Sequence, residues 1–85
     1  MKLKSDFITH NSGTEQLMIS AGGSFGGMVR SNSTAAAIID LLKSETDREG
    51  VVNAMLSRYE VERAVLERDV DRVIAKLREI GALDE

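Results

Sequence analysis

Residues Asn32–Leu42 read NSTAAAIIDLL, and this stretch divides the chain into two parts with different folding preferences. The polar side chains of residues 32–34 can accept hydrogen bonds from the free N–H groups at a helix start. Apolar residues then recur at the i, i+3, i+4, i+7 spacing of one helical face: Ala35, Ile38, Ile39 and Leu42. The stretch therefore predicts an amphipathic helix that begins near residue 32.

The part before this helix carries the strand signals and most of the glycine. Residues Phe7–Asn11 and Gln16–Ser20 are rich in residues that favour strands, and Ser12-Gly13-Thr14 between them is typical of a turn. A loop with four glycines follows at 21–27, and Met28–Ser31 then predicts a short third strand. The expected structure is a hairpin extended to a three-stranded antiparallel sheet, whose edges offer unpaired N–H and C=O groups.

The part after Leu42 predicts two further helices. The first opens with Thr46-Asp47-Arg48-Glu49, a capping-box pattern in which the Thr46 hydroxyl accepts from the Glu49 N–H. Its expected buried side consists of Val51, Val52, Met55, Leu56 and Tyr59. Gly50 within this helix costs about 1 kcal/mol relative to alanine, so the helix depends on packing.

The last predicted helix is the longest, from about Glu62 to Ile80, with Gly81 as the residue that ends it. Its contiguous apolar face is Leu66, Val70, Val73, Ile74, Leu77 and Ile80. A mixed flank lies beside that face and consists of Val65, Asp69, Arg72 and Lys76, in which Asp69 and Arg72 are spaced to pair. The predicted fold class is α+β, a winged helix-turn-helix with three antiparallel strands followed by three helices (βββααα), in a single domain over residues 1–85.

Composition excludes several functions. The 85 residues include no cysteine and one histidine, which disfavours disulfides, thiol chemistry and a resident metal or cofactor. The net charge of −3 argues against nucleic-acid binding. The N-terminal residues are not a signal peptide, and the longest apolar run, Ala35–Ile39, is far too short to span a membrane. We expect a cytoplasmic protein that is not an enzyme and has no catalytic residues.

Four features have both a functional and a structural interpretation, and the structural one is favoured. His10 is expected on a strand surface instead of serving as a general base. The glycine pairs of 22–27 are expected in a flexible loop instead of a phosphate-binding loop, because no helix start follows them directly. The carboxylates Glu67 and Asp71 alternate with arginines, as on a solvated helix surface. The methionines Met18, Met28 and Met55 are expected to fill the core.

Three blocks of the sequence together resemble one known family. The first block is Asn32–Leu42; the second is Thr46-x-x-Glu49 with Val51-Val52 and residues 55–59; the third is Asp69-Val70 with residues 73–77 and 81–83. Their order and spacing are similar to those of the PqqD-like proteins over about residues 28–83. Residues 5–27 match only as a compatible strand pattern.

The resemblance implies a recognition element for ribosomally synthesised and post-translationally modified peptides. Such a domain binds the leader of a precursor peptide and presents it to a modifying enzyme, often a radical S-adenosylmethionine enzyme. In this family the leader docks as an added strand on the third strand, beside the third helix. The implied fold is the sheet with three helices described above.

The peptide-binding residues expected on this basis come from the third strand and the last helix: Met28, Val29, Arg30, Ser31, Val65, Asp69, Arg72, Val73 and Lys76. Valines would receive apolar leader residues, and Arg30, Arg72 and Lys76 acidic ones. A structural role for Asp69 and a peptide contact are equally weighted. The alternative function is a winged-helix DNA-binding transcription regulator, and dimerisation through the open edge stays open.

Overall fold

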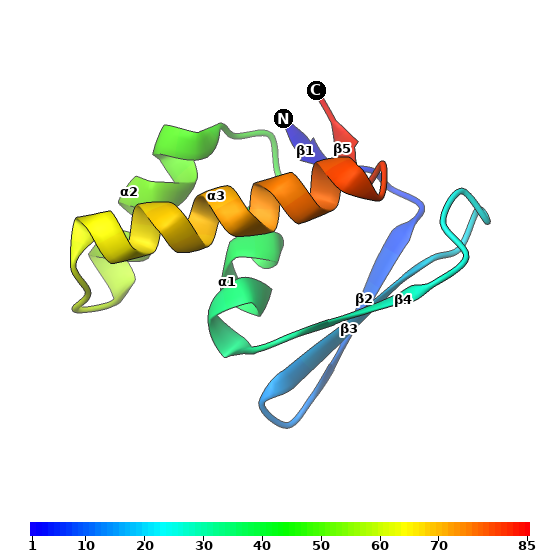
Figure 1. The fold of residues 1–85 in the computed structure, drawn as a ribbon, viewed down its shortest axis with the longest axis horizontal. Helices are drawn as coiled ribbons and strands as arrows, with labels where there is room; N and C mark the ends of the chain where they lie inside the picture. The colour runs from blue at the N-terminus through cyan, green and yellow to red at the C-terminus, as the bar shows by residue number, and fades with distance from the viewer.

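A computed structural model describes residues 1–85 (Figure 1). Three central strands and three helices follow one another along the chain, and a short strand lies at each end. The elements are β1 (Lys2–Leu3), β2 (Phe7–Ser12), β3 (Glu15–Ser20), β4 (Met28–Ser31), α1 (Ser33–Leu41), α2 (Arg48–Arg58), α3 (Arg63–Glu79) and β5 (Leu83–Asp84). The α+β class and the βββααα order are confirmed; the winged-helix arrangement stays a prediction.

The main sheet has the strand order β2-β3-β4, with both pairs antiparallel. A two-residue turn joins β2 to β3, because Ser12 pairs directly with Glu15. Gly13 takes the first turn position with a φ of 63°, and Thr14 at the second position does not have a positive φ. This is the pattern of a type II′ turn, which suits the twist of a hairpin. The predicted hairpin and third strand are confirmed.

Helix α1 begins as the sequence predicts. The Asn32 side chain accepts a hydrogen bond of 2.9 Å from the Ala35 N–H. The side chains of Ile38, Ile39 and Leu42 are fully buried, so the apolar stripe faces the core.

Helix α2 begins one residue later than the capping-box pattern predicts. Asp47 is the N-cap, and its carboxylate accepts from the Gly50 N–H at 2.7 Å. Thr46 is held elsewhere, because its N–H donates to the Met1 carbonyl at 3.0 Å and its carbonyl accepts from the Met1 amino group at 2.7 Å. A Cβ at Gly50 would collide with the Thr46 side chain. The prediction that Thr46 caps this helix was therefore wrong, and Gly50 has a steric reason that helix propensity does not capture.

Helix α3 crosses both other helices (Figure 1). It buries Leu66, Val70, Ile74 and Leu77, four of the six residues predicted for its apolar face. The other two, Val73 and Ile80, are half-buried at the edge of the core. Gly81 follows the helix with a φ of 73°, which confirms the predicted stop.

The chain ends form a second sheet that the sequence analysis did not predict. Strands β1 and β5 pair antiparallel, with Lys2 opposite Asp84 and Leu3 opposite Leu83 (Figure 1). Both leucines are buried, and the Leu3 N–H also donates to the Leu42 carbonyl at 2.7 Å. Two-residue strands carry no periodicity, so only tertiary contacts reveal them.

The core lies between the three helices, the inner face of the main sheet and the terminal sheet. It consists of Leu3, Phe7, Met18, Ile38, Ile39, Leu42, Val51, Val52, Met55, Leu66, Val70, Ile74, Leu77, Ala82 and Leu83. Two of the three methionines behave as predicted, because Met18 and Met55 are buried. The prediction for Met28 was wrong: 54% of it is exposed, because it lies on the outer face of the edge strand β4.

Candidate functional site

Strand β4 leaves one of its two sides unpaired. It pairs with β3 alone, from Gln16 opposite Ser31 to Ile19 opposite Met28. No residue of β4 takes part in the backbone hydrogen bonds that lie outside helices and strands. Because alternate residues of a strand direct their N–H and C=O to the same side, this edge can hydrogen-bond an added strand.

A groove of about 230 Å³ lies between this edge and helix α3. Its lining residues are Val29, Arg30, Ser31, Asn32, Ala35, Ile39, Arg72, Val73, Lys76 and Leu77. The buried side chains of Ile39 and Leu77 form an apolar floor, and the half-buried Val29 and Val73 face each other across it. Arg72 and Lys76 add positive charge along the helical wall. This is a groove with an apolar base and a basic side.

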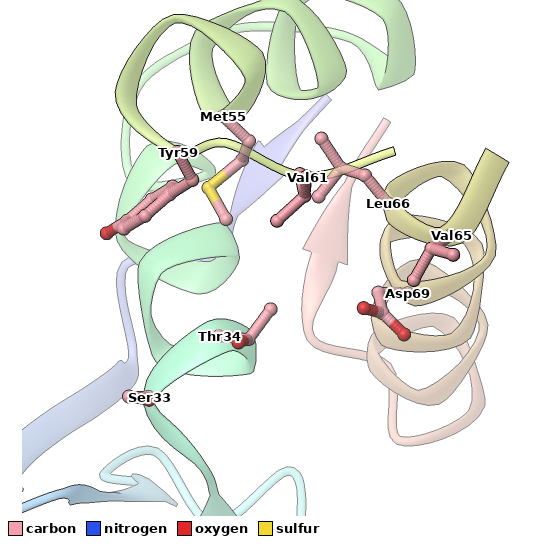
Figure 2. Close-up of a pocket in the computed structure, with 8 residues that line it drawn as sticks. All are labelled: Ser33, Thr34, Met55, Tyr59, Val61, Val65, Leu66 and Asp69. Carbon is pink, nitrogen blue, oxygen red and sulfur yellow. The ribbon is translucent and has the colours of Figure 1, made fainter. Parts of the chain in front are cut away.

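A second hollow, of about 200 Å³, opens farther along α3 toward its start (Figure 2). It is lined by Ser33, Thr34, Met55, Tyr59, Val61, Val65, Leu66 and Asp69. Three of these apolar side chains are unusually exposed, namely Tyr59 at 48%, Val61 at 46% and Val65 at 41%. A smaller hollow of about 160 Å³ that includes Asp69, Arg72 and Val73 lies between this hollow and the groove and shares lining residues with both. The two depressions therefore form one continuous path along α3.

The basic side chains of the groove are weakly engaged within the chain. Arg72 lies 3.7 Å from Asp69 and Lys76 lies 3.9 Å from Glu79, both at the long end of an ion pair. The Arg72 side chain is 80% exposed and that of Lys76 is 53% exposed. Exposed pairs of this kind contribute about 0–1 kcal/mol. Both cations can turn to a bound carboxylate at little cost.

The structure brings eight of the nine predicted site residues to this path. Val29, Arg30, Ser31, Arg72, Val73 and Lys76 line the groove, while Asp69 and Val65 line the hollow. Met28 lines neither depression and lies on the outer face of β4, opposite Ile19. Arg30 is on that same face by strand alternation, and its guanidinium lies 3.1 Å from the Glu15 carboxylate, so it borders the groove without pointing into it. Asp69 also makes the predicted pair with Arg72.

Sequence reasoning missed the residues of the hollow that lie between α2 and α3. It assigned Tyr59 to the buried side of the second helix, which was wrong. Tyr59 is the C-cap of α2, with extended backbone, and its ring therefore leaves the buried stripe (Figure 2). The only signal was Val61, an apolar residue in an otherwise charged linker.

The histidine and two of the carboxylates that were weighed for acid–base chemistry, Glu67 and Asp71, lie outside the groove and the hollow. His10 lies exposed on β2, as predicted. Glu67 and Asp71 form ion pairs with arginines, as predicted for a solvated helix surface. The Arg48 guanidinium, through its hydrogen bond, lowers the pKa of Asp71, the opposite of what a general acid needs. No group of three or more histidine, cysteine, aspartate or glutamate residues is arranged to hold a metal ion.

Helix α3 is a poor candidate for reading DNA. Its five cations are offset by four carboxylates of the same helix, Glu67, Asp69, Asp71 and Glu79, which leaves a formal charge of +1. Phosphate binding relies on a larger excess of positive charge than this helix carries.

No helix has both the length and the apolar composition that crossing a bilayer demands.

Two solved structures resemble this chain over nearly its whole length. One, "TbiB1 in Complex with the TbiA(beta) Leader Peptide", has a TM-score of 0.80 at 21% identity, covering 99% of this chain and 95% of that one. The other, "Lasso peptide synthetase B1 complexed with the leader peptide", has a TM-score of 0.73 at 26% identity, covering 95% and 93%. No curated protein sequence matches the chain. The model of the family described as coenzyme PQQ synthesis protein D (PqqD) matches residues 11–83, and the chain therefore belongs to the PqqD family.

Proposed function

We propose that this chain binds the leader of a ribosomally synthesised precursor peptide by strand addition to β4. The observation that carries the proposal is the unpaired edge of β4, which faces a groove with an apolar floor and a basic wall. A backbone edge supplies affinity for any extended peptide, and groove side chains then supply selectivity. Two proteins with the same fold are, by their descriptions, complexes with leader peptides, which supports the proposal.

The role we propose is non-catalytic. The groove is lined by apolar residues, three cations, Asn32 and one hydroxyl, that of Ser31, and no histidine, aspartate or glutamate lines it to act as a base for that hydroxyl. The chain would act as one recognition domain over residues 1–85 that presents the peptide to a separate modifying enzyme in the cytoplasm. We propose a radical S-adenosylmethionine enzyme for that partner, on the family resemblance. Ordering a flexible leader costs free energy, so we expect a dissociation constant near the micromolar range, which corresponds to a binding free energy of about −8 kcal/mol.

Titration of isotope-labelled protein with a leader tests the proposal. The probe is the leader segment of a short precursor peptide encoded beside this chain's gene. Amide signals of residues 27–32 and 65–76 should shift. Shifts confined to residues 1–15 would show that the peptide binds elsewhere and would overturn the proposal.

Two variants of α3 provide a matched comparison. Arg72→Glu reverses a charge in the groove, whereas Arg68→Glu reverses the same charge on the same helix outside the groove and the hollow. Both side chains are exposed, so both variants should fold. Arg72→Glu should weaken leader binding and Arg68→Glu should not. Equal losses would indicate long-range attraction by net charge instead of a specific groove.

A further inference from the structure

The relative direction of β4 and α3 defines which way a peptide would run. Strand β4 leads toward α1, whose first residues Ser33 and Thr34 line the hollow beside the start of α3. Val29 on β4, by contrast, lines the groove with Val73, Lys76 and Leu77, nearer the end of α3. The two elements therefore run in opposite directions along the path. Because antiparallel pairing is the more stable kind, a peptide added to β4 would run parallel to α3, from the hollow to the basic groove.

The hollow fits a large apolar side chain. Its volume of about 200 Å³ exceeds the ~150 Å³ of a cavity that accommodates benzene. Met55 and Leu66 lie at its base, and Tyr59, Val61 and Val65 leave apolar surface open to a ligand (Figure 2).

The distance along α3 relates the hollow to the basic side chains. From the midpoint of Val65 and Leu66 to the midpoint of Arg72 and Lys76, the helix advances about 13 Å at 1.5 Å per residue. An extended peptide covers that length in about four residues at ~3.3 Å each.

We propose, building on the function proposed above, that the path selects peptides by the order and spacing of two side chains. A large apolar residue, aromatic or branched, occupies the hollow between α2 and α3. An acidic residue about four positions toward the peptide's C-terminus meets Arg72 and Lys76. The chain thus reads the direction of its peptide as well as its composition.

Three fluorescein-labelled synthetic peptides on a threonine and glutamine host test this, measured by fluorescence anisotropy. The first has Phe followed four residues later by Glu, the second has the two exchanged, and the third has them adjacent. The precursor leader serves as the reference. The first peptide should bind about tenfold or more tightly than the other two, because only it fills the hollow and meets the cations together.

Each outcome separates this inference from the proposed function. Equal affinities for the three peptides, or binding of the leader but of none of them, would overturn the order-and-spacing rule alone. Failure of the leader itself to bind would overturn the proposed function as well.

Two variants locate the two contacts. Val61 lies in an exposed linker, so Val61→Ser should fold. The variant should lower the affinity for the first peptide about tenfold and leave the affinity for the second unchanged. Arg72→Glu should prefer a peptide with Lys in place of Glu, whereas Arg68→Glu should keep the original preference. If Val61→Ser weakens binding of neither peptide, the hollow does not hold the apolar residue and the inference fails. If it weakens binding of both alike, the hollow accepts the apolar residue in either order and the order rule fails.

Discussion

Backbone methylation of the peptide tests strand addition directly. A methyl group on an amide nitrogen removes one hydrogen-bond donor and leaves the side chain unchanged. In an added strand every second N–H points to β4 and the others point away. A scan of single N-methyl groups along the precursor leader should therefore reduce affinity at alternate positions only.

The length of β4 fixes the size of the effect. Strand β4 has four residues, Met28–Ser31, and two of them direct their backbone groups to the free edge. Each of these two residues offers one N–H donor and one C=O acceptor. The guest thus gains about four hydrogen bonds, each with a net value of about 0.5–1.5 kcal/mol. Methylation at a paired position also leaves a β4 carbonyl without a partner, so a loss of about 1–3 kcal/mol is expected. This corresponds to a dissociation constant that is roughly 5- to 150-fold larger at two positions of the scan.

Isothermal titration calorimetry with each methylated leader measures these losses. The alternation should extend over about four residues and disappear on either side, because β4 is no longer than that. A uniform loss along the leader would reflect a lower tendency to become extended. Losses spaced three or four residues apart would indicate that the leader binds as a helix, and strand addition would be refuted.

Three further predictions concern stability. Asn32→Ala removes the cap of α1 and should cost about 1 kcal/mol, seen as a fall in Tm of about 4–8 °C by calorimetry. Gly50→Ala should fail to give the stabilisation of about 1 kcal/mol that helix propensity predicts, because the new Cβ meets the Thr46 side chain; a clear gain in urea denaturation would contradict this. The hydrogen bond from Arg48 lowers the pKa of Asp71, so this pair stabilises the fold above about pH 4 and the effect is lost as the pH falls further. Asp71→Asn should therefore narrow the difference in urea midpoint between pH 6 and pH 3.

Local patterns in the sequence were sufficient to predict the main elements. The stripe through Ile38, Ile39 and Leu42 and the cap at Asn32 define α1 without any tertiary information. The terminal sheet was not predictable, because Leu3 and Leu83 are far apart in sequence and each lies in a strand of two residues. Short strands acquire their register from the surrounding core instead of from their own periodicity.

The candidate site was predicted only in part, because one of its walls follows from local helical periodicity and the hollow depends on tertiary packing. The face of α3 that borders the groove follows from helical geometry, and Arg72, Val73 and Lys76 lie where that geometry places them. The hollow depends on where α2 stops and how the linker to α3 packs. Tyr59 would lie on the buried stripe if α2 continued by one more turn, so its exposure reflects a helix boundary that periodicity alone does not determine.

The main sheet has two free edges, and the structure distinguishes between them. Strand β2 is longer than β4, yet its second half, from His10 to Ser12, is exposed and polar, and the hollow that Asn11 shares with α1 is lined mostly by polar residues. The Lys43 ammonium also donates to the Thr9 hydroxyl at 2.6 Å and places a cation near the middle of this strand, a common way to protect an edge from pairing. Beside β4, the half-buried Val73 supplies an apolar contact that β2 lacks. An added strand on β4 therefore gains side-chain burial together with its backbone hydrogen bonds, and the edge of four residues offers too few hydrogen bonds to retain a peptide that does not also fill the groove.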